Sequence, residues 1–235
     1  DSVAISAVGY EQKWIVLKRD RDTIFLKRAA IQLDEVVVKL PEFERERRIG
    51  SFDRKDVIQF MFEPINPVLY TQYFPYDSSY HSTPFIKEIN ILTNSAVKNA
   101  KFIVRLYKIG SDGFPGEFLY DQNIYAFAKK GRHMVTIDLS DLAIRFPEEG
   151  FYLGLQTLGI EENQNNHSIK KWNTEGELVE TVSYSPSFGQ FTFETGQWAF
   201  KALNKYGQWD EICIFPKDDR PFWFFRLAAE LVLTD

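Results

Sequence analysis

Apolar and polar residues alternate with a period of two along much of residues 101–158. The apolar positions of this alternation form three runs: Phe102, Val104 and Leu106; Val135, Ile137 and Leu139; and Phe151, Leu153 and Leu155. Successive residues of a strand point to opposite faces of a sheet, so each run predicts a strand with one buried face. Buried faces of this kind must pack against each other, and the pattern therefore predicts an all-β chain with a jelly-roll-like β-sandwich.

Turn-forming residues separate these strands. Ser111-Asp112-Gly113 and Pro115-Gly116 are expected to break the chain after the first run, because glycine accepts a positive φ and proline presets a turn. The segment Glu117–Ala128 is predicted to be one further strand, and Glu148-Glu149-Gly150 is predicted to be a turn. The polar segment Glu161–Asn166 is predicted to be an exposed loop.

The last predicted strand covers Phe222–Thr234. Every second residue of this segment is apolar, which predicts that one face carries Trp223, Phe225, Leu227, Ala229 and Leu231. With the runs above, we place the β-sandwich domain at residues 53–235. Residues 41–52 precede it and contain the charged run Glu42-Phe43-Glu44-Arg45-Glu46-Arg47-Arg48. Mixed charges at this spacing predict a solvated linker or a short helix, with a partner-binding segment as the less favoured interpretation.

Residues 1–40 are predicted to form a small β module of their own. Its central part reads ISAVGYEQKWIVLKRDRDTIFLKRAAIQLDEVVV, from Ile5 to Val38. This segment resembles the C-terminal half of the carboxypeptidase-regulatory-like domain, most specifically at Ser6–Tyr10 and Leu33–Val38. The resemblance implies a partial Ig-like or transthyretin-like β module. It also implies a periplasmic, outer-membrane or cell-surface location in a Gram-negative bacterium.

A shorter resemblance covers Val104–Leu119. Its sequence, VRLYKIGSDGFPGEFL, is similar to strand–turn–strand units of secreted bacterial jelly-roll domains, some of which bind carbohydrate. The shared residues are Gly113, Pro115, Gly116 and Leu119, and turn chemistry alone could produce that pattern.

Composition excludes some partners. The formal net charge of −5 provides no basic field for nucleic acid. No apolar run approaches the ~20 residues of a spanning helix, so we expect no transmembrane segment in this chain. The single cysteine, Cys213, rules out an internal disulfide framework, and its apolar neighbours predict a buried, inert thiol.

Motifs for metal or cofactor binding are absent from the sequence, and we expect neither. His81, His133 and His167 lie far apart without a second ligand at helical or hairpin spacing. Asp112 before Gly113 fits an ordinary turn better than a calcium loop. No glycine-rich loop for phosphate occurs.

Catalytic motifs are likewise missing. A Ser-His-acid triad needs no proximity in sequence, but no Gly-x-Ser-x-Gly occurs. Glu148-Glu149 and Glu161-Glu162 are carboxylate pairs that could serve glycoside hydrolysis, yet their loop-like context favours solvated charge. We therefore expect a non-enzymatic protein, with a glycoside hydrolase as the less favoured alternative.

Aromatic residues in polar surroundings are the candidate binding residues: Trp172, Trp198, Tyr206 and Trp209. Sugar rings stack on flat aromatic faces, and the nearby Asn, Asp and Gln could bond hydroxyl groups. The alternative is that these aromatics cap the core or pack between the two domains. We expect a carbohydrate-binding accessory module with a glycan or an envelope protein as partner; the alternative function is a structural, protein-docking domain of an envelope assembly.

Overall fold

A computed structural model describes the chain at residues 2–5, 13–16, 24–27, 45–57, 59–60, 68–165, 169–172, 178–193, 200–203, 208–211, 213–214 and 223–235. The chain divides into two compact units, Asp1–Pro41 and Glu42–Asp235. The first unit contains β1 (Ser2–Ile5) paired antiparallel with β2 (Lys13–Val16). Its resemblance-based identity as an Ig-like or transthyretin-like module stays a prediction.

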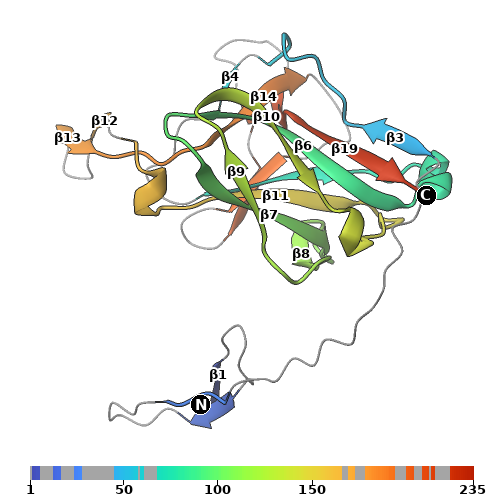
Figure 1. Ribbon diagram of the computed structural model, residues 1–235, viewed down its shortest axis with the longest axis horizontal. Helices are drawn as coiled ribbons and strands as arrows, with labels where there is room; N and C mark the ends of the chain where they lie inside the picture. Colours follow the sequence, from blue (N-terminus) through green and yellow to red (C-terminus); the bar gives the residue numbers. More distant parts are fainter. Residues whose placement is uncertain are drawn as a thin grey trace. The chain divides into compact units, whose positions relative to one another are not determined.

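The second unit is a sandwich of two antiparallel sheets, which confirms the predicted all-β class (Figure 1). One sheet runs in the order β17 (Cys213–Ile214), β18 (Trp223–Leu227), β14 (Ser187–Phe193), β6 (Phe85–Ser95), β19 (Ala229–Thr234) and β3 (Glu46–Ile49). To this sheet also belong β10 (Gly131–Asp138), paired with β6, and β4 (Gln59–Phe60), paired with β14.

The other sheet runs in the order β16 (Trp209–Glu211), β15 (Phe200–Leu203), β5 (Leu69–Phe74), β11 (Phe151–Thr157), β7 (Ala100–Ile109) and β8 (Pro115–Phe118). Beside β8, β9 (Ile124–Ala128) pairs with the same edge of β7. The chain crosses between the sheets repeatedly, from β5 to β6 to β7 and from β9 to β10 to β11.

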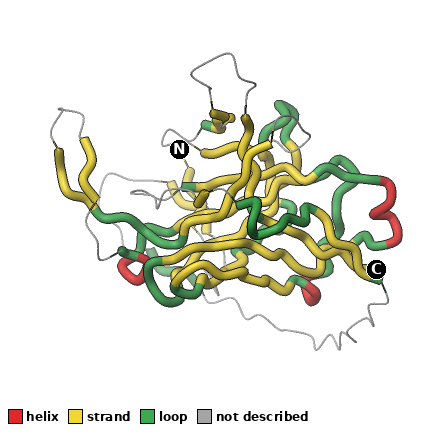
Figure 2. Tube along the Cα trace, turned by 90° about the horizontal axis from the view of Figure 1, so that it is seen from above, coloured by secondary structure: helices red, strands yellow, loops and turns green. Residues whose placement is uncertain are grey.

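Connections between these strands are short. They include the 3-10 turns η1 (Ser78–Ser82), η2 (Ser140–Leu142) and η3 (Glu161–Asn163), drawn in red in Figure 2 among the yellow strands. A further hairpin, of β12 (Ile169–Trp172) and β13 (Leu178–Thr181), forms its own two-stranded sheet.

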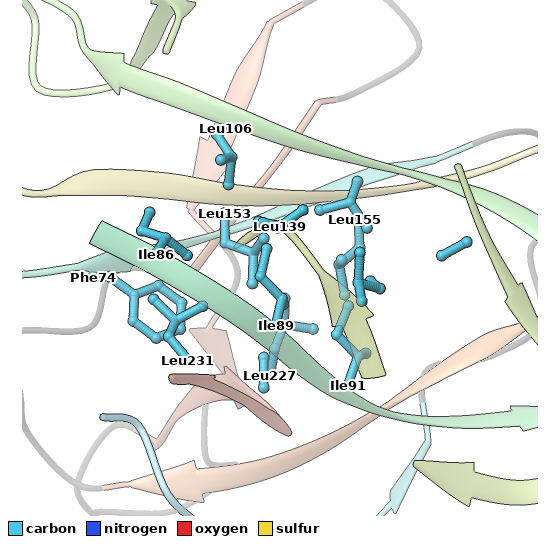
Figure 3. Packing of buried hydrophobic residues seen from close by; sticks show 14 of the residues in the cluster. Phe74, Ile86, Ile89, Ile91, Leu106, Leu139, Leu153, Leu155, Leu227 and Leu231 are labelled. Atoms are coloured by element: carbon cyan, nitrogen blue, oxygen red, sulfur yellow. The ribbon is translucent and has the colours of Figure 1, made fainter. Parts of the chain in front are cut away.

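The core lies between the two sheets, where the predicted alternation places it. All the residues of the three apolar runs are buried except Val135, which is partly buried and packs against the same cluster. Figure 3 shows Leu106, Leu153 and Leu155 of one sheet beside Ile89, Ile91 and Leu231 of the other. The burial of these apolar faces is the main contribution to holding the sheets together.

Several predicted boundaries are wrong. Pro115 and Gly116 do not break the strand pairing, because they lie in β8, at the sheet edge where proline is tolerated. Glu117–Ala128 is two strands, β8 and β9, rather than one. The predicted linker at 41–52 contains β3, whose residues pair with β19, so this part belongs to the sandwich.

The predicted C-terminal strand is interrupted at Ala228. There the backbone N–H donates to the carbonyl of Gly189 and the carbonyl accepts from Leu92 N, so the chain leaves the β14 ladder and joins that of β6. Leu227, Ala229 and Leu231 are buried in one cluster, as the alternation predicted.

The loop at 161–166 was predicted to be exposed, but it contains a buried polar residue, Asn163. The side chain of Asn163 accepts a hydrogen bond from Lys101 N (2.7 Å) and donates to the carbonyls of Lys101 (2.7 Å) and Leu158 (3.1 Å). These bonds satisfy backbone groups at the start of β7, which is why a polar residue is fully buried here.

Candidate functional site

The outer face of the β5–β11–β7 sheet carries a second apolar cluster. Buried Leu69, Tyr107 and Tyr152 form its centre, and these partly buried residues pack against them: Tyr73, Ile109, Leu203 and Trp209. The alternation predicted that Tyr107 and Tyr152 would point away from the core, and they do. The face is therefore covered by aromatic side chains rather than open to water.

Ring contacts fix Trp209 within this cluster. Its ring meets that of Tyr107 edge to face, with 6.1 Å between centroids and an interplanar angle of 81°. Tyr107 also contacts Phe118 at 5.1 Å, and Tyr73 contacts Tyr152 at 5.4 Å. Such contacts between rings stabilise a defined orientation, so Trp209 is held at the surface in a fixed position.

The loop that joins β7 to β8 lies against the same residues and is closed by hydrogen bonds. Gly110 N donates to the carbonyl of Phe114 (2.7 Å), and Phe114 N donates to Oδ1 of Asp112 (3.0 Å). The hydroxyl of Tyr152 donates to the carbonyl of Gly113 (2.7 Å), which ties the loop to the sheet below. The Asp112 carboxylate is thus presented from a rigid turn.

A surface hollow of about 280 Å³ lies between this loop and β16. Its lining residues are Asp112, Phe114, Gln208 and Trp209. It combines an indole ring, a second aromatic ring, an acidic group and an amide. A sugar fits that chemistry, since its apolar ring face stacks on aromatic rings while its hydroxyls donate to carboxylate and amide oxygens.

Two tyrosines of the apolar cluster have a raised pKa. Desolvation raises the pKa of Tyr107, and it raises the pKa of Tyr73 with a further contribution from Glu149. The phenol of Tyr73 donates a hydrogen bond to the carbonyl of Glu149 (2.8 Å).

Two carboxylates of the described segments have a lowered pKa. Hydrogen bonds from Ser79 and Ser140 lower the pKa of Asp77 and Asp138 respectively, the reverse of what a general acid requires. Glu148 and Glu149 lie in the turn before β11, and Glu161 and Glu162 are exposed in η3. Of the described residues that line the hollow, Asp112 supplies the carboxylate.

The structure describes the side chain of only one of the four predicted binding residues. Trp209 lines the hollow. Trp172 ends β12 opposite Leu178, and its side chain lies outside what the structure describes; Trp198 and Tyr206 lie outside the described residues altogether. Among the predicted residues whose side chains the structure describes, Trp209 is therefore the one at the hollow.

Sequence reasoning missed two members of the hollow, Asp112 and Phe114, and anticipated Gln208 only as one of the polar neighbours of the candidate aromatics. Asp112 was noted only as a turn residue, and its separation in sequence from Trp209 hides their proximity. The Asp-Gly turn next to Phe114 was a usable signal, because loop ends of a sandwich collect binding groups.

The other residues considered for metal or nucleophilic chemistry are scattered. His81 and His133 are exposed, and His167 lies outside the described residues. Cys213 lies in β17 opposite Phe224, with its side chain not described. Within the described ranges, no three His, Cys, Asp or Glu residues are grouped as metal ligands would be.

No helix in the described part of the chain has the length and apolar character to cross a membrane. Comparison with family models, with curated proteins and with solved structures finds no match for the chain.

Proposed function

We propose that this protein is a non-enzymatic, carbohydrate-binding module of a bacterial cell envelope, and that the hollow at Trp209 is its binding site. The observation that carries the proposal is the composition of the hollow, with Trp209 and Phe114 beside the carboxylate of Asp112 and the amide of Gln208. The envelope setting, periplasmic or at the outer membrane, is supported by the resemblance of residues 5–38 to the carboxypeptidase-regulatory-like domain.

A glycan array followed by calorimetry on the strongest binder tests the proposal. Trp209→Ala removes the stacking ring and is expected to weaken binding about tenfold or more, the equivalent of ~1.4 kcal/mol. Asp112→Asn keeps the acceptor for Phe114 N but removes the charge, and is expected to weaken binding while leaving the loop intact.

Tyr125→Ala is the matched aromatic control, since Tyr125 is 49% exposed and neither lines the hollow nor belongs to the apolar cluster around Trp209. It is expected to bind as the wild type does. Equal binding by all the variants, or no glycan bound by the wild type, would reject the hollow as a sugar site.

Protein docking is the second candidate function, and an observation in the first unit favours it. Phe25 is 79% exposed and Val16, in β2, is 65% exposed among the residues of this unit that the structure describes. Exposed apolar side chains mark protein-interaction surfaces, so an apolar partner surface would stabilise this unit by covering them. Light scattering of the purified chain with envelope fractions tests this; a monomer that captures no partner counts against it.

A further inference from the structure

The two sheets part along one side of the sandwich, between β9 and β10 (Figure 1). A groove of about 400 Å³ lies there, lined by residues 124–127 of β9 and residues 135–138 of β10. Neighbouring residues of a strand point to opposite faces, so four consecutive residues line one groove only by presenting the edge of their strand. Backbone therefore walls this groove on both sides.

The backbone of β9 directs hydrogen-bonding groups toward the groove. Leu119 N donates to the carbonyl of Leu106. The backbone N–H and C=O groups of the even-numbered residues of β7 therefore point toward the edge where β8 and β9 lie. The pairs Ala126↔Phe102 and Ile124↔Val104 consequently share the ladder hydrogen bonds. The N–H and C=O groups of Tyr125 and Phe127 then point away from β7, toward the groove.

The same reasoning applies to β10. Leu139 N donates to the carbonyl of Lys87, so the odd-numbered residues of this segment bond to β6. The backbone groups of Thr136 and Asp138 therefore point away from β6. No strand among the described residues pairs with this edge of β10 or with the facing edge of β9.

The groove has an apolar floor and charged ends. Ala126 and Ile137 belong to the main core cluster, and Ile124 and Val135 pack against it, so the floor is apolar. At the end near the turn between the strands lie the exposed Lys129 and Lys130, and at the opposite end lies Asp138. The groove thus has a basic end and an acidic end.

We propose that this groove binds an extended segment of a partner protein, which adds a strand to the sandwich between β9 and β10. The segment lies antiparallel to β9, with alternate apolar side chains on the groove floor, an acidic residue near Lys129 and Lys130, and a basic residue near Asp138. Main-chain hydrogen bonds supply the affinity, and the floor and charged ends supply the selectivity. This interaction is additional to sugar binding, because the groove and the hollow share no residue.

Selection from a phage-displayed library of random nonapeptides against the whole chain tests the proposal. The selected peptides are expected to alternate apolar and polar residues, with an acidic residue toward the N-terminus and a basic residue toward the C-terminus. Adding the best peptide should slow amide hydrogen exchange at least tenfold at Tyr125, Phe127 and Thr136. The Ala126 amide, already bonded to β7, should not change.

Two substitutions at one position separate the backbone from the side chain. Phe127→Pro deletes an N–H that faces the groove and keeps the β9–β7 bonds, so peptide affinity should fall at least tenfold with little change in the unfolding curve. Phe127→Leu keeps the N–H and removes only the ring, and should bind peptide as the wild type does. Ala126→Pro should instead destabilise the sheet, because it deletes an N–H that bonds to β7. This variant therefore tests whether the Ala126 N–H points toward β7 and the Phe127 N–H toward the groove.

Three results would overturn the proposal: a library that yields no peptide protecting these amides, equal peptide affinity in Phe127→Pro and Phe127→Leu, or unchanged stability in Ala126→Pro. A fourth is self-association. If light scattering shows a dimer and the Tyr125 and Phe127 amides gain protection with protein concentration alone, a second copy occupies the edge in place of a partner peptide.

Discussion

Ser140 stabilises the charged form of the Asp138 carboxylate at the end of β10. Its N–H and its hydroxyl both donate to Oδ1 of Asp138, at 2.9 and 2.6 Å. The hydroxyl bond is the main reason that the pKa of Asp138 is lowered, with the backbone bond second. A carboxyl group whose pKa is lower in the folded state stabilises the fold above its unfolded pKa, and this contribution is lost as pH falls through the folded pKa.

Ser140→Ala should therefore destabilise the protein at pH 7 and have little effect well below pH 3. Urea unfolding of both proteins at the two pH values measures the difference. An NMR titration should show the pKa of Asp138 moving up toward its ordinary value in the variant. A stability difference that persists undiminished at low pH would show that the hydroxyl acts through something other than the carboxylate.

At the scale of the element, two glycines in turns have the same backbone conformation but different surroundings. Gly113 has φ +78° and nothing within 4 Å of the position a Cβ would take, while Gly150 has φ +84° and would bring a Cβ to 2.6 Å from the carbonyl oxygen of Phe74. Both turns were predicted from the sequence, and the difference between them is a matter of packing.

Gly113→Ala should cost about 1 kcal/mol, the strain of a left-handed residue. Gly150→Ala adds a backbone clash and should cost more than ~3 kcal/mol. Thermal and urea unfolding of the two variants compare them directly. Similar losses in both would mean that the turn before β11 shifts freely to admit the methyl group.

The strands predicted best were those with strict alternation, such as β7 and β11. A period of two in apolar residues directly indicates a strand with one face toward an apolar core. The sequence could not show that the strand at 222–234 changes partners at Ala228, since this depends on which ladder each half joins. Nor could it place Asp112 beside Trp209, because their proximity depends on the order of strands in the sheet. The burial of Asn163 was missed since its partners are backbone groups of another segment.

At the scale of the whole unit, a buried glutamine joins the two sheets. Oε1 of Gln72 in β5 accepts a hydrogen bond from the backbone N–H of Leu227 in β18 (2.6 Å), and both residues are fully buried. Gln72→Met keeps much of the volume but leaves that N–H without an acceptor. A loss of about 1 kcal/mol is expected on unfolding in urea, because the cost of one unsatisfied buried donor is partly offset by removal of Gln72 Nε2, which is buried without a hydrogen-bond partner among the described residues.

Hydrogen exchange gives this prediction a local readout. The Leu227 amide should exchange slowly in the wild type and faster in Gln72→Met, while Leu153, in the middle of β11, should change only by the global loss of stability. An unaltered Leu227 rate would mean that another acceptor replaces the glutamine.

The position of β19 between β6 and β3 also has a consequence for biosynthesis. Arg48 of β3 and Glu230 of β19 bond to each other although they are 182 residues apart in the chain. During translation β3 is made early, and its ladder partner leaves the ribosome only after nearly all of the sandwich has been synthesised. Such distant pairing slows folding, so the nascent chain keeps an open sheet edge until β19 has been synthesised. Chaperone protection of this edge matters most before β19 pairs with β3.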